Sequence, residues 1–353
     1  MKQYCRIRCS GGCSILMLCA AYLIVAEIPI YTGIHCPGIT GYWRAMLEDM
    51  VYGRAYKPYV KRQLVPLVVR GSMMLMPDEF IERSKQKFAD SQLAKQLNWP
   101  VEFAPEFMLS LLIMYGSLIG FLLVLRYFLL LFFTMSSGLS HLIVLIVGLA
   151  LPVTFRGQVA IYDFSQLLLF TTALVLLFRK RWVLFYPVYV FACINKETSI
   201  LIPAVFACWL GWKVLRNPYL WHLLSQILIG GAIVLALSLV FKNNPGVDTE
   251  WHLQRNLHMP FGVLGWFHIM VLSVAIIMCL WRWSESPLLL RRGLVATLPV
   301  LLCAALFWAD IEELRDYYEA LPFTVGLFLV TVGQQLGIRQ RVYYDVKEDV
   351  QMS

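Results

Sequence analysis

Charged residues are scarce in this chain. They make up 15% of the 353 residues, whereas hydrophobic residues make up 59%. A soluble domain has about 25% charged and about 45–50% apolar residues. The composition therefore excludes a soluble globular protein and a disordered one, and it predicts a polytopic membrane protein. The formal net charge of +8 is typical of basic cytoplasmic loops in such a protein and does not indicate nucleic-acid binding.

Several motifs that identify common catalytic or cofactor sites are also missing. The sequence has no Gly-rich phosphate loop, no G-x-G-x-x-G after a strand, no H-E-x-x-H and no paired C-x-x-C. Its nine cysteines lie mostly in apolar runs or in the basic N-terminal segment, which is not the pattern of a disulfide framework. His141 and His268 are expected to bond neighbouring helices and not to hold haem. We therefore expect no bound cofactor, and the need for a divalent metal stays open.

Long apolar runs dominate the sequence. Ten of them are candidate transmembrane helices, since a span needs about 20 apolar residues. The run at 182–194 is shorter, and we interpret it as half of a broken pair with 199–215. The sequence predicts an all-α fold and a single integral membrane domain over 1–353, with about 10 transmembrane helices at 13–34, 107–125, 127–153, 159–178, 182–194, 199–215, 220–241, 261–281, 293–309 and 320–337.

Lysine and arginine are unevenly distributed between the two sides of this predicted bundle. With the N-terminus inside, the inner segments carry 15 of them and the short outer loops carry 5. Basic residues accumulate in cytoplasmic loops, so both termini are predicted to be cytoplasmic. The one large extramembrane segment, 35–106, is then an outer, periplasmic loop, and we expect its helices to lie in the membrane interface.

Four polar clusters stand out among the apolar runs, and the predicted topology places all of them on the outer side. Charge at a membrane boundary is costly and points to function. We expect the clusters to converge on a single outward-facing cavity. They comprise Lys57–Pro66, Arg156 with Tyr162–Gln166, Asn195–Ser199 and Glu312–Glu319.

Each cluster also has a purely structural interpretation, and the sequence leaves both interpretations open. The structural alternatives are a helix cap at Asp163, a hairpin-tip ion pair of Lys196 with Glu197, a solvated ion-pair ladder over Glu312, Arg315 and Glu319, and a lipid-phosphate anchor at Arg62.

The order and spacing of these motifs resemble those of a known superfamily. Arg62 begins an R-x-L-x-P element on the large first outer loop, and Tyr162 begins Y-D-x-x-Q. Asn195 begins N-K-E-T, and Glu313 begins E-x-R-x-Y-x-E before the last helix. In this layout, which covers nearly the whole chain, the protein resembles the C-type membrane glycosyltransferases, the superfamily of protein mannosyltransferases and aminoarabinose transferases.

The resemblance implies a bacterial inner-membrane enzyme that transfers a sugar from a polyprenyl-phosphate donor on the outer face. In that superfamily an acid on the first outer loop is the general base, which takes the proton of the attacking hydroxyl. Glu48 and Asp49 are the first candidates by position, and Glu27 is the third. The sequence departs from the superfamily pattern at one point, because Thr40 stands where an acid typically precedes the aromatic pair.

The resemblance also implies that cations on outer loops hold the donor phosphate. Arginine is suited to this role because its planar fork binds phosphate bidentately. By position the phosphate partners would be Arg62, Lys196 and Arg315. The full set of predicted substrate-binding residues is Arg62, Asp163, Gln166, Asn195, Lys196, Glu197, Glu312, Arg315 and Glu319.

Two other classes of function stay open on the sequence. One is a transporter or flippase for a lipid-linked anionic head group, and the other is a structural membrane subunit. A transporter should carry polar residues deep along its helices, whereas the inner halves here are mostly Leu, Val, Ile and Phe. The expected partners are membrane lipid and a lipid-linked sugar, with no nucleic acid, and no protein partner is indicated.

Overall fold

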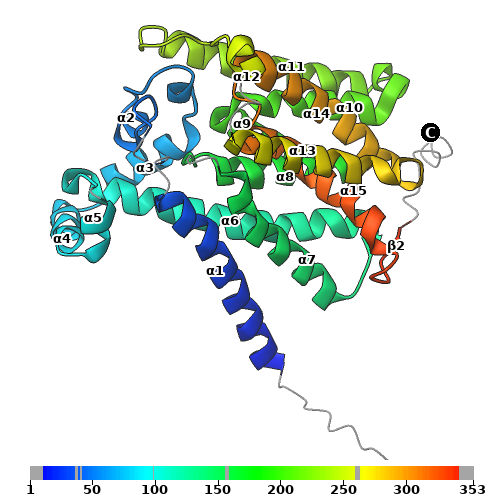
Figure 1. Ribbon diagram of the computed structural model, residues 1–353. Helices are drawn as coiled ribbons and strands as arrows, with labels where there is room; N and C mark the ends of the chain where they lie inside the picture. Colours follow the sequence, from blue (N-terminus) through cyan, green and yellow to red (C-terminus); the bar gives the residue numbers. More distant parts are fainter. Residues whose placement is uncertain are drawn as a thin grey trace, which may run out of the picture.

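The computed structural model describes residues 11–35, 39, 42–97, 99–155, 159–258 and 263–341. Within these ranges the chain is nearly all helical, which confirms the predicted fold class. The two short strands, β1 (Phe133–Thr134) and β2 (Arg339–Gln340), pair antiparallel. Figure 1 shows the long helices packed together, with the smaller helices of the predicted first outer loop gathered at one end of the bundle.

Six helical stretches among the described residues are long and apolar enough to cross a membrane, which supports a multi-pass membrane protein. The predicted number of about ten spans is not confirmed, because several further apolar helices are shorter. The six stretches contain α1 (Gly11–His35), α6 (Ala104–Phe132), α7 (Ser137–Ala150), α10 (Leu201–Leu210), α11 (Tyr219–Val240) and α14 (Leu288–Trp308). The other apolar helices are α3 (Leu64–Leu75), α8 (Asp163–Phe178), α9 (Trp182–Asn195), α13 (Val263–Trp281) and α15 (Leu321–Gly333).

Short elements connect these helices and build the first outer loop. The α-helical ones are α2 (Leu47–Val51), α4 (Asp78–Ala89), α5 (Gln92–Leu97) and α12 (Leu253–His258). The 3-10 turns are η1 (Tyr59–Lys61), η2 (Val101–Phe103), η3 (Leu151–Thr154), η4 (Glu197–Ile200), η5 (Gly211–Leu215), η7 (Trp283–Glu285) and η8 (Leu314–Ala320).

One helix boundary differs from the sequence prediction. The sequence placed a break between two spans at Arg126, but α6 continues through this residue to Phe132. The Arg126 Nε donates to the Ser140 Oγ at 2.8 Å, so the guanidinium finds a partner on the neighbouring helix and does not end its own. The chain turns after Phe132, and Ser136 then caps α7 by accepting a hydrogen bond from the Leu139 amide at 3.3 Å.

The predicted break between two short apolar helices is confirmed. Helix α9 ends at Asn195, and Lys196 has extended backbone angles (φ −156°, ψ 135°) before η4 begins. The first outer loop is held against this break, since the Gln63 amide donates to the Ile194 carbonyl at 3.0 Å. The break therefore brings the polar 195–198 segment next to Arg62.

Helix α6 lies at the centre of the packing and contacts α1, α7 and α8. Near its end the Phe128 ring packs against Phe178 and Phe323, with ring centroids 6.2 and 5.9 Å apart. Close contact between α14 and α15 depends on Gly293, where an added Cβ would lie 2.1 Å from the Phe323 ring. Helix α11 by contrast leaves most of its apolar side chains exposed, as a lipid-facing helix does.

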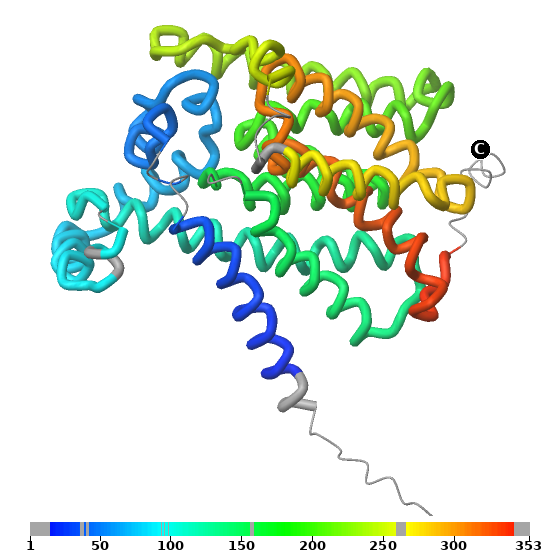
Figure 2. Tube along the Cα trace, in the orientation of Figure 1, coloured from blue at the N-terminus to red at the C-terminus, as the bar shows by residue number. Residues whose placement is uncertain are grey.

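The two ends of the bundle hold different elements, which can be followed along the trace in Figure 2. We call one end the outer end, after the predicted topology; α2 to α5 lie there, beside the start of α6. At the other end α6, α8, α10 and α13 finish, and β2 pairs with β1. We call this second end the basic end, since it holds the described turns that carry the predicted inner lysines and arginines. That the basic end faces the cytoplasm stays a prediction.

Candidate functional site

A connected group of polar side chains lies where four sequence-distant segments meet at the outer end. These segments are the turn after η1, the start of α8, the break between α9 and η4, and η8. We call the group the outer polar cluster; it comprises Arg62, Tyr162, Asp163, Gln166, Asn195, Lys196, Glu197, Glu313, Arg315, Asp316 and Glu319. Arg156, which the sequence grouped with Asp163, lies outside the described residues.

Arg62 joins the first outer loop to the η4 segment. Its Nε and Nη2 donate to the two carboxylate oxygens of Glu197 at 3.2 and 2.7 Å, which is a bidentate pair. Its Nη1 donates to the Tyr162 hydroxyl, and its guanidinium lies 4.5 Å from the centre of the Tyr162 ring. Arg62 therefore binds Glu197 across the fold, and the pair predicted between Lys196 and Glu197 is not the one that the structure forms.

Arg315 is buried between two carboxylates. Its Nη1 lies 3.4 Å from Asp163 Oδ2, and its Nη2 lies 3.0 Å from Glu313 Oε2. The same Asp163 oxygen accepts a hydrogen bond from the Ala160 amide at 2.8 Å, just before α8 begins. Asp163 lies in the first turn of α8, but the N-cap residue is Tyr162 and no side-chain cap hydrogen bond forms, so the predicted helix cap at Asp163 is wrong. Its carboxylate instead binds the turn before the helix and pairs with Arg315. Glu312, which precedes this pair in the chain, is buried as well.

Two side-chain amides connect the α8 and α9 parts of the cluster to Glu319. The Asn195 Nδ2 donates to Gln166 Oε1 at 3.2 Å, and the Gln166 Nε2 donates to Glu319 Oε1 at 3.1 Å. Thr198 donates its hydroxyl hydrogen to the same Glu319 oxygen. Asn195 Oδ1 and Glu319 Oε2 are buried and have no hydrogen-bond partner among the described residues. These hydrogen bonds hold the centre of the cluster together, but two of its buried oxygen atoms lack a hydrogen-bond donor among the described residues.

Lys196 lies in this cluster with little exposure and poor hydrogen bonding. The residue is 3% exposed, and its Nζ lies 3.7 Å from Glu319 Oε1, which is too long for a hydrogen bond. No hydrogen bond joins this ammonium group to any residue that the structure describes. A buried ammonium group is costly unless it is paired and hydrogen-bonded. Its three donors are therefore available to an acceptor such as a phosphate oxygen.

Asp316 is a member of the cluster that the sequence did not select as a site residue. Its carboxylate is half-buried and interacts electrostatically with Arg62, Lys196 and Arg315. Burial, and then the negative charge of Glu313, raise the pKa of Asp316 from 3.8 to about 6. The signal was present in the sequence, because Asp316 stands inside the E-x-R-x-Y-x-E element, but the helical ladder interpretation gave it no role. A carboxylate with a pKa near neutrality is suited to accept a proton.

The three acids that the resemblance proposed as bases lie elsewhere. Glu48 is buried in α2, where burial raises its pKa, and Asp49 pairs with Arg54 at 3.3 Å. Glu27 is exposed on α1. None of the three forms a hydrogen bond or ion pair with the outer polar cluster among the described residues. The structure does bring together all the predicted phosphate partners; that they bind substrate stays a prediction.

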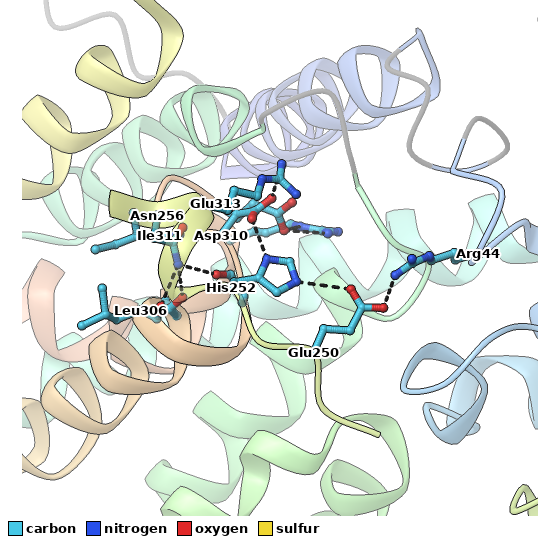
Figure 3. Close-up of polar contacts among 12 residues, drawn as sticks. Arg44, Glu250, His252, Asn256, Leu306, Asp310, Ile311 and Glu313 are labelled. Carbon is cyan, nitrogen blue, oxygen red and sulfur yellow. Dashed lines mark hydrogen bonds and ion pairs between the residues drawn. The ribbon is translucent and has the colours of Figure 1, made fainter. Parts of the chain in front are cut away.

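A second polar group next to the cluster was missed altogether. Figure 3 shows His252 between two carboxylates: its Nδ1 lies 2.9 Å from Asp310 Oδ1, and its Nε2 lies 3.3 Å from Glu250 Oε2. Glu250 in turn pairs with Arg44 of the first outer loop, and Arg255 pairs with Asp310 at 2.8 Å. Glu250 and Arg255 lie within three residues of His252, but Arg44 and Asp310 come from distant segments that the local sequence could not indicate.

Asn256 fixes this second group to the end of α14. Its Nδ2 lies within hydrogen-bond distance of the carbonyl oxygens of Ala305, Leu306 and Ala309, and its Oδ1 accepts from the Ile311 amide at 3.2 Å (Figure 3). These bonds satisfy carbonyl groups that a helix end leaves unpaired. They also set the direction in which the chain leaves α14 toward η8, and so they position Arg315 and Asp316.

Among the residues that the structure describes, no group of three or more His, Cys, Asp or Glu side chains could hold a metal ion. His141, which the sequence predicted to bond a neighbouring helix, does so: its Nδ1 lies 2.9 Å from the Tyr22 hydroxyl of α1. Comparison of the chain with protein-family models, with curated proteins and with solved structures found no match.

Proposed function

We propose that the protein is a bacterial inner-membrane glycosyltransferase that acts on a polyprenyl-phosphate sugar donor at the outer polar cluster. The observation that carries the proposal is the convergence of Arg62, Lys196 and Arg315 with Asp316, from segments far apart in the chain. Cations are required next to a leaving phosphate, and a carboxylate is required next to an attacking hydroxyl. The cluster supplies both kinds of group in one place.

The chemistry assigns a role to three of these residues. Lys196, whose ammonium donors have no acceptor among the described residues, binds a phosphate oxygen of the donor. Arg62 contributes its fork when Glu197, whose side chain is 42% exposed, gives up its pair. Asp316 takes the proton of the acceptor hydroxyl, the hydroxyl oxygen bonds to the anomeric carbon, and the bond from that carbon to the phosphate oxygen breaks. Attack from the side opposite the phosphate inverts the anomeric centre.

The distribution of buried charge supports a reaction on one side of the membrane. Every charged side chain that is buried among the described residues lies in the outer segments or at the helix ends next to them; these are Glu48, Glu106, Asp163, Lys196, Asp310, Glu312, Arg315 and Glu319. The buried faces of α6 and α8 toward the basic end are apolar. A transporter needs polar groups along its path, so this distribution favours an enzyme over a transporter.

Binding of undecaprenyl phosphate to the purified protein in nanodiscs tests the proposal. We expect undecaprenyl phosphate to bind more tightly than undecaprenol, which lacks the phosphate. Lys196→Met should remove this preference, whereas Lys242→Met, a matched change at an exposed outer lysine, should keep it. Equal binding of the two lipids to the unmodified protein would contradict the proposal.

Sugar transfer is the second part of the test. The protein in nanodiscs is incubated with a panel of radiolabelled polyprenyl-phosphate sugars and a membrane extract as the source of acceptor. We expect release of undecaprenyl phosphate with label in a new product. Movement of intact labelled donor across a vesicle membrane, with no cleavage, would instead establish the transporter alternative.

A further inference from the structure

A shallow, largely open cavity of about 260 Å³ lies at the basic end, away from the outer polar cluster. Three elements form it: the end of α10, the η7 turn and the first two turns of α14. Its volume is several times the roughly 30 Å³ that one water molecule occupies in the liquid. The lining residues are Cys208, Trp283, Leu288, Arg291, Arg292 and Val295.

The two arginines in this cavity have no acidic partner. Arg291 makes no hydrogen bond or ion pair with any residue that the structure describes, and its Nε is buried without an acceptor. Arg292 donates from Nη1 to the Trp209 carbonyl at 2.7 Å and pairs with no described carboxylate. The acid nearest in sequence, Glu285, pairs with Arg282 at 3.2 Å. Two guanidinium groups in one cavity without a counter-charge indicate that an anion completes the site.

The start of α14 adds to the positive potential of the cavity. Its first turn contains no acidic residue, and Pro287 before it offers no side-chain acceptor to the free amides. The positive end of a helix attracts anions, and it does so more strongly when basic side chains lie beside it.

An apolar strip on α14 leads away from the arginines. Leu288 and Val295 are 45% and 54% exposed, and Pro299 and Cys303 continue the same helix face as exposed residues. The helix is long and apolar enough to cross a membrane, so this face is open to lipid.

Three tryptophans are exposed at the same end of the bundle, as tryptophan is at the level of lipid head groups: Trp212, Trp221 and Trp281. The strip fits an acyl chain, and the arginines fit a head-group phosphate.

We propose that the cavity between α10 and α14 binds an anionic membrane phospholipid, with its phosphate on Arg291 and Arg292 and an acyl chain along the strip from Leu288 to Cys303. Basic pockets between transmembrane helices are suited to such head groups. The site lies at the basic end, so it does not depend on the function proposed for the outer polar cluster.

Native mass spectrometry of the full chain, solubilised in detergent, tests this site. Phosphatidylglycerol and phosphatidylcholine with identical acyl chains are added, and the lipid-bound fractions are compared. Each basic residue near a lipid surface favours anionic lipid, and the two arginines together should give a preference of about 30-fold for phosphatidylglycerol. Arg291→Gln combined with Arg292→Gln should abolish this preference. If the double variant fails to fold, Arg291→Gln alone should reduce it.

Two controls keep the result specific. Arg179→Gln combined with Arg181→Gln removes the same charge from exposed positions at the basic end, and should keep the preference. Val295→Asn should weaken lipid binding, because it places a polar group on the strip. The proposal is overturned if the double variant keeps the preference, if the control pair loses it, or if Val295→Asn has no effect. It is also overturned if inorganic phosphate or glycerol phosphate competes as well as the lipid, since the ligand is then a soluble phosphate.

Discussion

The outer polar cluster and the arginine cavity at the basic end hold buried or partly buried cations in opposite ways. In the cluster, Arg62 and Arg315 each meet at least one carboxylate, and the acids outnumber the cations. In the cavity, Arg291 and Arg292 meet no described carboxylate. Cations that pair closely inside the protein, as Arg62 and Arg315 do, hold its segments together. Cations with poor internal pairing, which are Lys196 in the cluster and both arginines in the cavity, are available to an external anion. Five predictions test this contrast.

The largest effect is expected at Asp316. Asp316→Asn keeps the shape of the side chain but removes the proton acceptor, so sugar transfer should fall by about 10²–10⁴-fold. The base form is present above the pKa of about 6, so the rate of the unmodified protein should rise with pH up to that value and then level off. The same assay ranks the other acids when it is applied to Glu48→Gln, Asp49→Asn and Glu27→Gln. Full activity of Asp316→Asn would assign the proton transfer to one of them.

The same residue should leave a signature in stability. Folding raises the pKa of Asp316 from 3.8 in the unfolded chain to about 6. Its contribution to the stability of the folded state is therefore fully present below pH 3.8, where the carboxyl group is protonated in both states. This contribution is lost as pH rises through about 6. Thermal unfolding in nanodiscs should therefore show the unmodified protein losing stability relative to Asp316→Asn over this range. A constant difference between the two proteins would contradict the raised pKa.

The next effect separates the two regions by stability. Arg315→Ala removes one partner of a buried charge pair and leaves Asp163 and Glu313 without their cation, so the free energy of unfolding should fall by about 3–5 kcal/mol. Titration with a denaturing detergent measures it. Arg315→Met, which restores most of the volume but not the charge, should be nearly as damaging. A loss as small as that of a surface substitution would mean that the cluster does not hold the fold.

A smaller effect is expected for Arg62→Lys. Lysine keeps the positive charge but cannot form the two parallel bonds to Glu197, so about one charge-assisted hydrogen bond is lost. The free energy of unfolding should therefore fall by about 1.5–3 kcal/mol. We expect binding of undecaprenyl phosphate to be weakened and not abolished, whereas Arg62→Ala abolishes it. If Lys and Ala are equally damaging, the geometry of the fork matters more than the charge.

The smallest effect is expected for Arg291→Ala. No described partner is lost, so the free energy of unfolding in neutral detergent should change by no more than about 0.5 kcal/mol. Added phosphatidylglycerol should stabilise the unmodified protein and not the variant, as ligand linkage requires. A large loss in neutral detergent would show that Arg291 has a structural role, and the contrast between the two regions would disappear.

Much of the fold could be predicted because the membrane dictates it. Every backbone polar group in the hydrocarbon region has to be paired within its own segment, so apolar runs have to be helices. The break at Lys196 was predictable from the short apolar runs on either side. The end of α6 was not, because Arg126 finds Ser140 on the next helix, a partner that local sequence cannot reveal.

Local sequence determined that the chain is helical, that it is rich enough in apolar residues to lie in a membrane, and that its polar motifs occur in four short elements. Tertiary structure decided which of these side chains meet. Arg62 pairs with Glu197 and Arg315 with Asp163 across more than a hundred residues, while Glu48 and Asp49 remain in α2. The physical reason is that a buried charge has to be neutralised by whichever opposite charge the packing places within a few ångströms, and packing is a property of the whole chain.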